Sequence, residues 1–238
     1  MAVINWDFFT KLPPSPGADG GGLGNAILGT IYMVGIASVL AIPVGVMAGI
    51  YASEFGNNKL ARAVKFISDV LSGVPSIVIG IFGYIVFVKP FGTYSAFAGG
   101  ASLAIIMIPL IVRTTEEMLL LVSDDLREAS LALGATSGQT IMKVVLPSAA
   151  KGIITGVMLS VARAAGETAP LLFTALNSRY WPGDLFEKTA SLTIYIYNYA
   201  ISPYENWQDL AWGGSLVLIT MILLSNILTR YFANKINN

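Results

Sequence analysis

Five apolar stretches dominate the chain, and each is long enough to cross a membrane as a helix. They cover residues 23–53, 66–88, 91–112, 152–176 and 210–229. About 20 consecutive apolar residues span a hydrocarbon core roughly 30 Å thick, so each stretch predicts one transmembrane helix. The pattern therefore predicts an all-α, polytopic membrane helix bundle formed by residues 23–238.

Small residues and prolines inside the stretches indicate how these helices pack. Two glycine pairs, Gly45 with Gly49 and Gly152 with Gly156, have the spacing that lets helices approach closely. A proline removes a backbone donor from a helix and is expected to kink it. Prolines stand within the apolar stretches at Pro43, Pro75, Pro109 and Pro170.

Basic residues are distributed unevenly over the connecting segments, and this predicts the orientation. Alternate connections place one group on one side: Lys59, Arg62, Lys65, Arg113, Arg127, Lys143, Lys151, Arg230 and Lys235. The other side receives only Lys11, Lys89, Arg179 and Lys188. Cytoplasmic loops are enriched in basic residues, so we expect the carboxyl terminus inside and the amino terminus outside. The Tyr and Trp residues of segment 177–209 then lie at the outer interface, which suits their amphipathic rings.

Residues 1–22 are rich in Pro and Gly and predict an external strap. They do not combine a basic segment with a following apolar run, so they do not form a signal peptide. Because the chain would start outside without a signal, we expect that a first helix precedes this sequence.

Composition narrows the function. Only 12% of the residues are charged and 55% are hydrophobic, which is typical of a membrane protein. The 14 basic residues equal the 14 acidic ones, so nothing favours nucleic-acid binding. The chain has no cysteine and no histidine, which excludes disulfides, thiolate metal sites and histidine-activated nucleophiles. We expect no metal site, and a membrane enzyme is disfavoured.

The polar stretch 113–151 predicts a helical hairpin, residues 123–147, on the cytoplasmic side. Asp125 and Glu128 have the spacing of a capping box, so a helix is expected to start at Asp125. Gly134 is expected to end it. A second helix is predicted from residue 137 to residue 146, closed by Pro147. From these residues alone the hairpin is either a surface linker or an element that docks a partner.

Two charges lie deep in the fourth apolar stretch. Arg163 and Glu167 are four residues apart and share one helix face. A helix entering the bilayer near residue 152 places Arg163 roughly 17 Å deep, close to the middle. An arginine there costs about 2.5–3.5 kcal/mol on insertion scales, so the pair indicates a substrate path. Thr168 is a further candidate for that path.

Two interpretations of the pair remain open. Arg163 either binds an anion in the path while Glu167 balances its charge, or the pair only orients two helices. Arg113 with Glu116 and Glu117 repeats the pattern near the inner boundary. We interpret these three as secondary candidates that favour a local ion-pair cluster.

The cytoplasmic hairpin resembles the EAA motif of ABC importer permeases. The matching residues are Glu128-Ala129-Ser130-x-x-x-Gly134 and, after nine residues, Val144-Val145-Leu146-Pro147; Ser130 and Val144 replace the usual Ala and Ile. The resemblance implies the type I ABC importer (MetI-like) transmembrane fold. It also implies that coupling to an ATPase is carried by Glu128, Ala129, Ser130, Gly134, Leu146 and Pro147.

Residues 113–118 and 162–176, with 22–26 and 207–212, resemble the phosphate permeases of this class. The resemblance implies ATP-driven import of inorganic phosphate across a bacterial cytoplasmic (inner) membrane. Such permeases usually have six spans, whereas five are predicted here. The implied partners are a second permease subunit, a dimer of ATPase subunits and an external phosphate-binding protein. We expect no cofactor in this chain, because ATP would be bound by the ATPase, and no enzymatic activity of its own.

Two other functions stay open. One is an importer for another oxyanion, such as sulfate or molybdate, because a single arginine does not fix the anion. The other is an ion-gradient-driven transporter working alone, against which the EAA-like motif argues.

Overall fold

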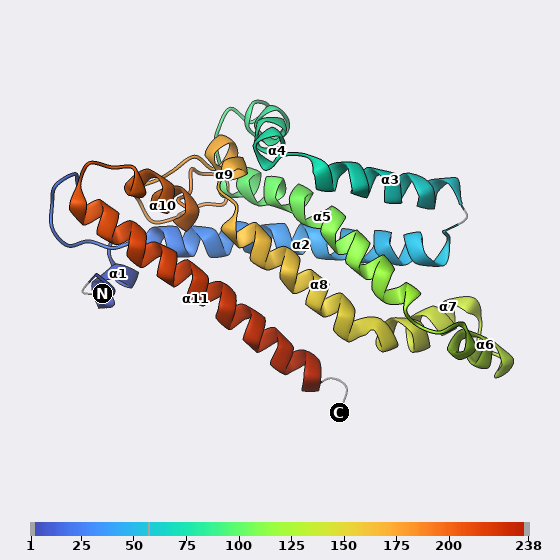
Figure 1. Cartoon of the computed structure of the whole chain (residues 1–238). Coiled ribbons are helices and arrows are strands. Elements are labelled where there is room, and N and C mark those ends of the chain that lie inside the picture. The colour runs from blue at the N-terminus through green and yellow to red at the C-terminus, as the bar shows by residue number, and fades with distance from the viewer. Residues whose placement is uncertain (1–2, 57, 236–238) are drawn as a thin grey trace.

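The computed structural model describes residues 3–56 and 58–235, and its long helices run side by side in a bundle (Figure 1). The long elements are α2 (Gly24–Glu54), α3 (Lys59–Gly73), α5 (Ala96–Leu120), α8 (Leu146–Gly166) and α11 (Glu205–Lys235). The short ones are α1 (Trp6–Thr10), α4 (Ser76–Gly83), α6 (Asp124–Ala132), α7 (Ser137–Thr140), α9 (Ala169–Thr174) and α10 (Leu192–Ala200). Two π-helical segments, η1 (Tyr84–Val88) and η2 (Ile141–Val145), continue α4 and α7. In Figure 1, α6 and α7 lie at one end of the bundle, and α1 and α10 lie at the other.

Among the described residues, four helical segments are long and apolar enough to span a bilayer. They are Gly24–Glu54, Ala96–Leu120, Ser137–Gly166 and Glu205–Leu228. The second predicted span, 66–88, is not one straight helix, because α3 and α4 are bent by 106° at the break between them. Pro75 explains the break: Val74, which precedes it, has an extended backbone with ψ of 129°, as a proline demands of its neighbour.

Two other predicted spans also have different bounds. The third begins at Ala96 rather than residue 91 and continues to Leu120, so Arg113, Glu116 and Glu117 lie on α5 instead of in a loop. The fourth, 152–176, is interrupted after Gly166. Pro170 prevents a continuous helix there, because its ring would collide with the carbonyl of Gly166 and it has no N–H to donate.

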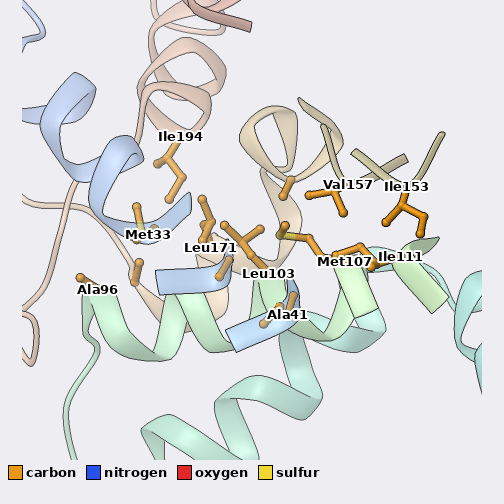
Figure 2. Packing of buried hydrophobic residues seen from close by; sticks show 14 of the residues in the cluster. Met33, Ala41, Ala96, Leu103, Met107, Ile111, Ile153, Val157, Leu171 and Ile194 are labelled. Atoms are coloured by element: carbon orange, nitrogen blue, oxygen red, sulfur yellow. The ribbon is translucent and has the colours of Figure 1, made fainter. Parts of the chain in front are cut away.

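Helix α5 is the centre of the bundle. Of its most apolar 18-residue window, 72% is buried, against 28% for each of the other three candidate spans. Figure 2 shows Leu103, Met107 and Ile111 of α5 packed between residues of α2 and residues of α8. The other spans therefore present most of their apolar surface outward.

The two glycine pairs both face α5, one pair from α2 and the other from α8. A Cβ added to Gly45 of α2 would lie 2.7 Å from Cβ of Ile111, and one added to Gly49 would lie 2.6 Å from Cβ of Thr115. A Cβ on Gly156 of α8 would meet Cβ of Thr114 at 2.6 Å. The predicted role of these glycines in close helix packing is confirmed.

The end that carries the chain's first residues forms a second core. Phe8 of α1, Leu192 and Tyr195 of α10, and Leu210 of α11 are buried together. The strap 1–22, of which residues 3–22 are described, contains the helix α1, which the sequence did not predict. Burial raises the pKa of Tyr195 and that of Tyr199, so both phenols stay neutral in this core.

We expect Gly45→Ala to destabilise the bundle, because the added methyl group must displace Ile111 of α5. Overpacking of this kind costs about 1–3 kcal/mol. Gly35→Ala is the matched control on the same helix, since nothing lies within 4 Å of a Cβ added there. Thermal unfolding of the purified protein in detergent measures both. Equal melting temperatures for the two variants would contradict the close approach of α2 and α5.

Candidate functional site

Arg163 lies in the last turn of α8, at the point where the helix breaks. A cation in the last turn of a helix is stabilised by the helix dipole. Glu167 lies outside the helix with an extended backbone, φ of −74° and ψ of 134°. Its Oε1 nevertheless lies 3.6 Å from Nε of Arg163. The pair thus forms across the helix end rather than along one helical face.

Neighbouring helices hold the break in place. The hydroxyl of Thr193 on α10 donates to the backbone carbonyl of Glu167 at 3.0 Å. On the other side, a Cβ added to Gly80 of α4 would lie 2.9 Å from Cα of Pro170. Thr168 is half-buried in this break and makes no side-chain hydrogen bond as the N-cap of α9. The backbone around Arg163 is therefore fixed by α4 and α10.

The guanidinium of Arg163 keeps its donors available. Its distance of 3.6 Å to Glu167 is an ion pair but too long for a hydrogen bond. Among the described residues it has no hydrogen-bond partner, and its side chain is 51% exposed. Arg127 is the opposite case: it is 19% exposed and donates three hydrogen bonds. Arg163 can therefore offer its fork of donors to an oxyanion, as guanidinium groups commonly do.

Arg113 belongs to an interhelical ion-pair network. Its Nε lies 3.0 Å from Asp69 Oδ1 of α3, and its Nη1 lies 3.6 Å from Glu116 Oε2. Lys65 of α3 reaches the other oxygen of Glu116 at 2.6 Å. Glu117 is exposed and lies outside this network. The charges join α3 to α5, which favours the local cluster over an anion contact.

At the opposite end of the bundle, α6 and α7 form the hairpin that the sequence predicted, with a different start. Helix α6 begins at Asp124 after Ser123, and Ser123 makes no side-chain cap. The capping box predicted for Asp125 and Glu128 is therefore wrong. A capping box is present at α7 instead, between Thr136 and Gln139.

The end of α6 agrees with the prediction. Gly134 has φ of +87°, and its N–H donates to the carbonyl of Leu131 at 2.9 Å. The N–H of Ala135 donates to the carbonyl of Ser130 at 3.3 Å. These two bonds form a Schellman motif, for which glycine is the preferred residue.

A buried hydrogen bond joins the two arms of the hairpin. The hydroxyls of Ser130 on α6 and Thr140 on α7 lie 2.9 Å apart. The sequence analysis noted Ser130 as a replacement of the usual alanine and as one of the residues that the resemblance implies in coupling. In this chain it ties the first helix of the hairpin to the second.

The second arm continues directly into the membrane helix. The sequence predicted that it would close at Pro147, but Ser137–Gly166 is one helical run. The π-turn η2 accommodates Pro147, and the N–H of Leu146 donates to the carbonyl of Ile141, five residues back. Between Pro147 and Arg163 the helix rises by about 24 Å. The hairpin and Arg163 thus lie at opposite ends of one rod.

The outer surface of α6 is exposed and partly apolar. Glu128, Ala129 and Gly134 are exposed, while Leu146 is half-buried and Pro147 is exposed at the start of α8. Leu133 is 90% exposed, and Leu126 and Leu131 are exposed beside it. An exposed apolar group of this kind at the end of a bundle is typical of a protein interface.

A model of the family described as "binding-protein-dependent transport system inner membrane component" matches residues 41–238 of the chain. The chain belongs to this family. The phosphate transport system permease protein PstA of Yersinia pestis is 45% identical over 95% of this chain and 78% of its own length. PstA of Haemophilus influenzae is 44% identical over 98% of this chain and 82% of its own. PstA 1 of Mycobacterium tuberculosis, strain CDC 1551, is 41% identical over 87% of this chain and 69% of its own length.

Solved structures confirm the predicted fold class. An inward-facing conformation of the MetNI methionine ABC transporter superposes with a TM-score of 0.77 at 21% identity, over 90% of this chain and 95% of that one. A bacterial alginate ABC transporter superposes with a TM-score of 0.65 at 14% identity, over 87% of this chain and 78% of that one. The chain is thus a membrane transport subunit with the ABC importer fold, and the resemblance found in its sequence is confirmed.

Three residues of the permease's site region escaped the sequence analysis. Thr193 bonds to Glu167, 26 residues away, and Glu54 bonds to Arg127, 73 residues away. Local sequence patterns do not predict contacts over such separations. Thr140 lies ten residues from Ser130. Near Thr140, the spacing of Thr136 and Gln139 is that of a capping box, a signal that the sequence analysis did not use.

We expect Thr140→Val to loosen the hairpin without unfolding the permease, because it leaves the Ser130 hydroxyl buried without this partner. A buried hydroxyl that loses its partner costs about 1–3 kcal/mol, so amide hydrogen exchange in α6 should accelerate by roughly 5- to 150-fold. Ser148→Ala is the control, since Ser148 is exposed and bonds only to the Val144 carbonyl. Unchanged exchange in α6 would contradict the role given to the Ser130–Thr140 bond.

Proposed function

We propose that this chain is a permease subunit of an ATP-driven importer of inorganic phosphate in a bacterial inner membrane. Two observations together support the proposal. The chain is 41–45% identical to PstA proteins, and Arg163 lies at a helix break with hydrogen-bond donors that are unused. Phosphate is an anion whose oxygens match a guanidinium fork two at a time.

In this proposal Arg163 receives the anion and Glu167 limits how tightly it is held. Conduction requires a site that binds well enough to be entered and weakly enough to be left. The carboxylate balances the guanidinium while the path is empty and repels the anion once it has bound. Thr168 supplies a hydroxyl in the same break. The alternative, a purely structural pair, fits less well, because the pair makes no hydrogen bond and joins groups only four residues apart.

The proposed partners follow from the family and from the exposed hairpin. An ATPase dimer of the PstB type would bind ATP. Its surface would contact Glu128, Ala129 and the end of α6. A second permease subunit of the PstC type would cover outward-facing apolar surface of the spans. An external phosphate-binding protein of the PstS type would dock on the end that carries α1 and α10. The amino terminus then lies outside, and the carboxyl terminus lies in the cytoplasm.

We expect Arg163→Gln to abolish phosphate uptake while the complex still assembles, because glutamine keeps a polar amide at this position but loses the charge, the reach and the fork of the guanidinium. Arg163→Lys should retain little activity, since a lysine keeps the charge alone. Phosphate uptake is measured in cells that lack their own high-affinity system and receive this chain with its partners. Lys89→Gln is the control for loss of one exposed basic residue.

Three outcomes would contradict parts of the proposal. Uptake that survives Arg163→Gln would make the Arg163–Glu167 pair structural. Uptake suppressed by excess sulfate or molybdate would favour another oxyanion as substrate. Uptake that persists without the ATPase would favour the ion-gradient-driven transporter.

A further inference from the structure

Arg127 joins three parts of the molecule at the hairpin end. It lies in α6, and its Nη1 donates to both carboxylate oxygens of Glu54, at 2.7 and 2.9 Å. Glu54 is the last residue of α2. Nη2 of the same guanidinium donates to the backbone carbonyl of Leu119, near the end of α5, at 2.9 Å. One side chain therefore binds two membrane helices at once.

The geometry is that of a rigid joint. The Arg127 and Glu54 side chains are only 19% and 11% exposed, so the pair is largely shielded from water. Nη1 is held by the carboxylate and Nη2 by the Leu119 carbonyl, so two separate partners fix the orientation of the planar guanidinium. Most exposed ion pairs at protein surfaces contribute little, but this pair is shielded and has a third bond to backbone.

The contacts of Arg127 with Glu54 and Leu119 determine which helices move when α6 moves. Through η2 the hairpin is continuous with α8 and so with the break at Arg163. Without Arg127, a movement of α6 would reach the bundle only through its covalent connections, α8 on one side and the short segment 121–123 to α5 on the other. With Arg127 in place the same movement also shifts the inner ends of α2 and α5, which pack against each other through Gly45 and Gly49.

We propose that Arg127 is a positioning residue that fastens α6 to the inner ends of α2 and α5, so that these parts move as one body when the ATPase partner acts on the hairpin. The inference rests on the proposed function of the hairpin as the docking element of the ATPase. It does not depend on which anion is carried.

The first test measures geometry and requires no transport. The chain contains no cysteine, so Met47→Cys on α2 and Asp125→Cys on α6 can be spin-labelled selectively; both positions are exposed. The distance between the labels is measured in the complex with its ATPase, in lipid nanodiscs, with and without bound nucleotide. We expect the same narrow distribution in both states, and a broadened one after Arg127→Gln. A distribution that shifts with nucleotide, or one that Arg127→Gln leaves unchanged, would overturn the proposal.

The second test measures coupling. We expect Arg127→Gln to lower the phosphate taken up per ATP hydrolysed by roughly 5- to 150-fold, the usual range of coupling between sites. Arg127→Lys should rescue only part of it, because an ammonium group lacks the planar fork that holds two partners. Lys59→Gln, an exposed basic residue at the same end, should leave the ratio unchanged. An unaltered ratio in Arg127→Gln would refute the role.

A double variant distinguishes loss of the Arg127 contacts from the effect of an unpaired carboxylate at Glu54. If Arg127→Gln acts only by leaving the Glu54 carboxylate unpaired, adding Glu54→Gln should restore coupling. If the joint itself transmits the movement, the double variant should stay uncoupled while the complex is recovered in normal amounts. Failure of wild-type protein to take up phosphate, with the label distances as expected, would contradict the proposed substrate and leave the joint standing.

Discussion

Close contact between helix backbones along α5 is the constraint on which the rest of the structure depends. In a bilayer the hydrophobic effect does not drive helices together, so association relies on packing and on small residues that let backbones approach. Gly45 and Gly49 of α2 and Gly152 and Gly156 of α8 provide this approach from two sides. Because α5 is held in this way, the polar elements at the two ends keep fixed positions relative to each other.

Proline then decides where these packed helices are interrupted. Pro75 and Pro170 follow the breaks between α3 and α4 and between α8 and α9, and the segments on both sides remain helical. Non-helical backbone at membrane depth is tolerated only where protein or a water-filled path covers it. Gly80 and Thr193 provide such cover at the second break. Pro147 has a milder effect, because a single π-turn absorbs it and the helix continues.

The sequence was sufficient for features that depend on local periodicity or on a single conformational requirement. Length and hydropathy predicted the class of fold, and Gly134 predicted the end of α6. Helix bounds were less accurate, because hydropathy does not distinguish one bent span from two short helices. Pro170 carried a usable signal, since its ring excludes a helical carbonyl at Gly166. The bond from Arg127 to Glu54 carried none, because it joins residues 73 positions apart.

The length of α2 has a consequence for the membrane around the protein. Its 31 residues extend over about 46 Å, whereas a hydrocarbon core is roughly 30 Å thick. Such a helix must tilt or project from the bilayer, and its tilt follows the local thickness of the lipid. Since the Glu54 end of α2 is bound to α6, a thicker or thinner membrane changes the angle at which the hairpin projects from the bilayer.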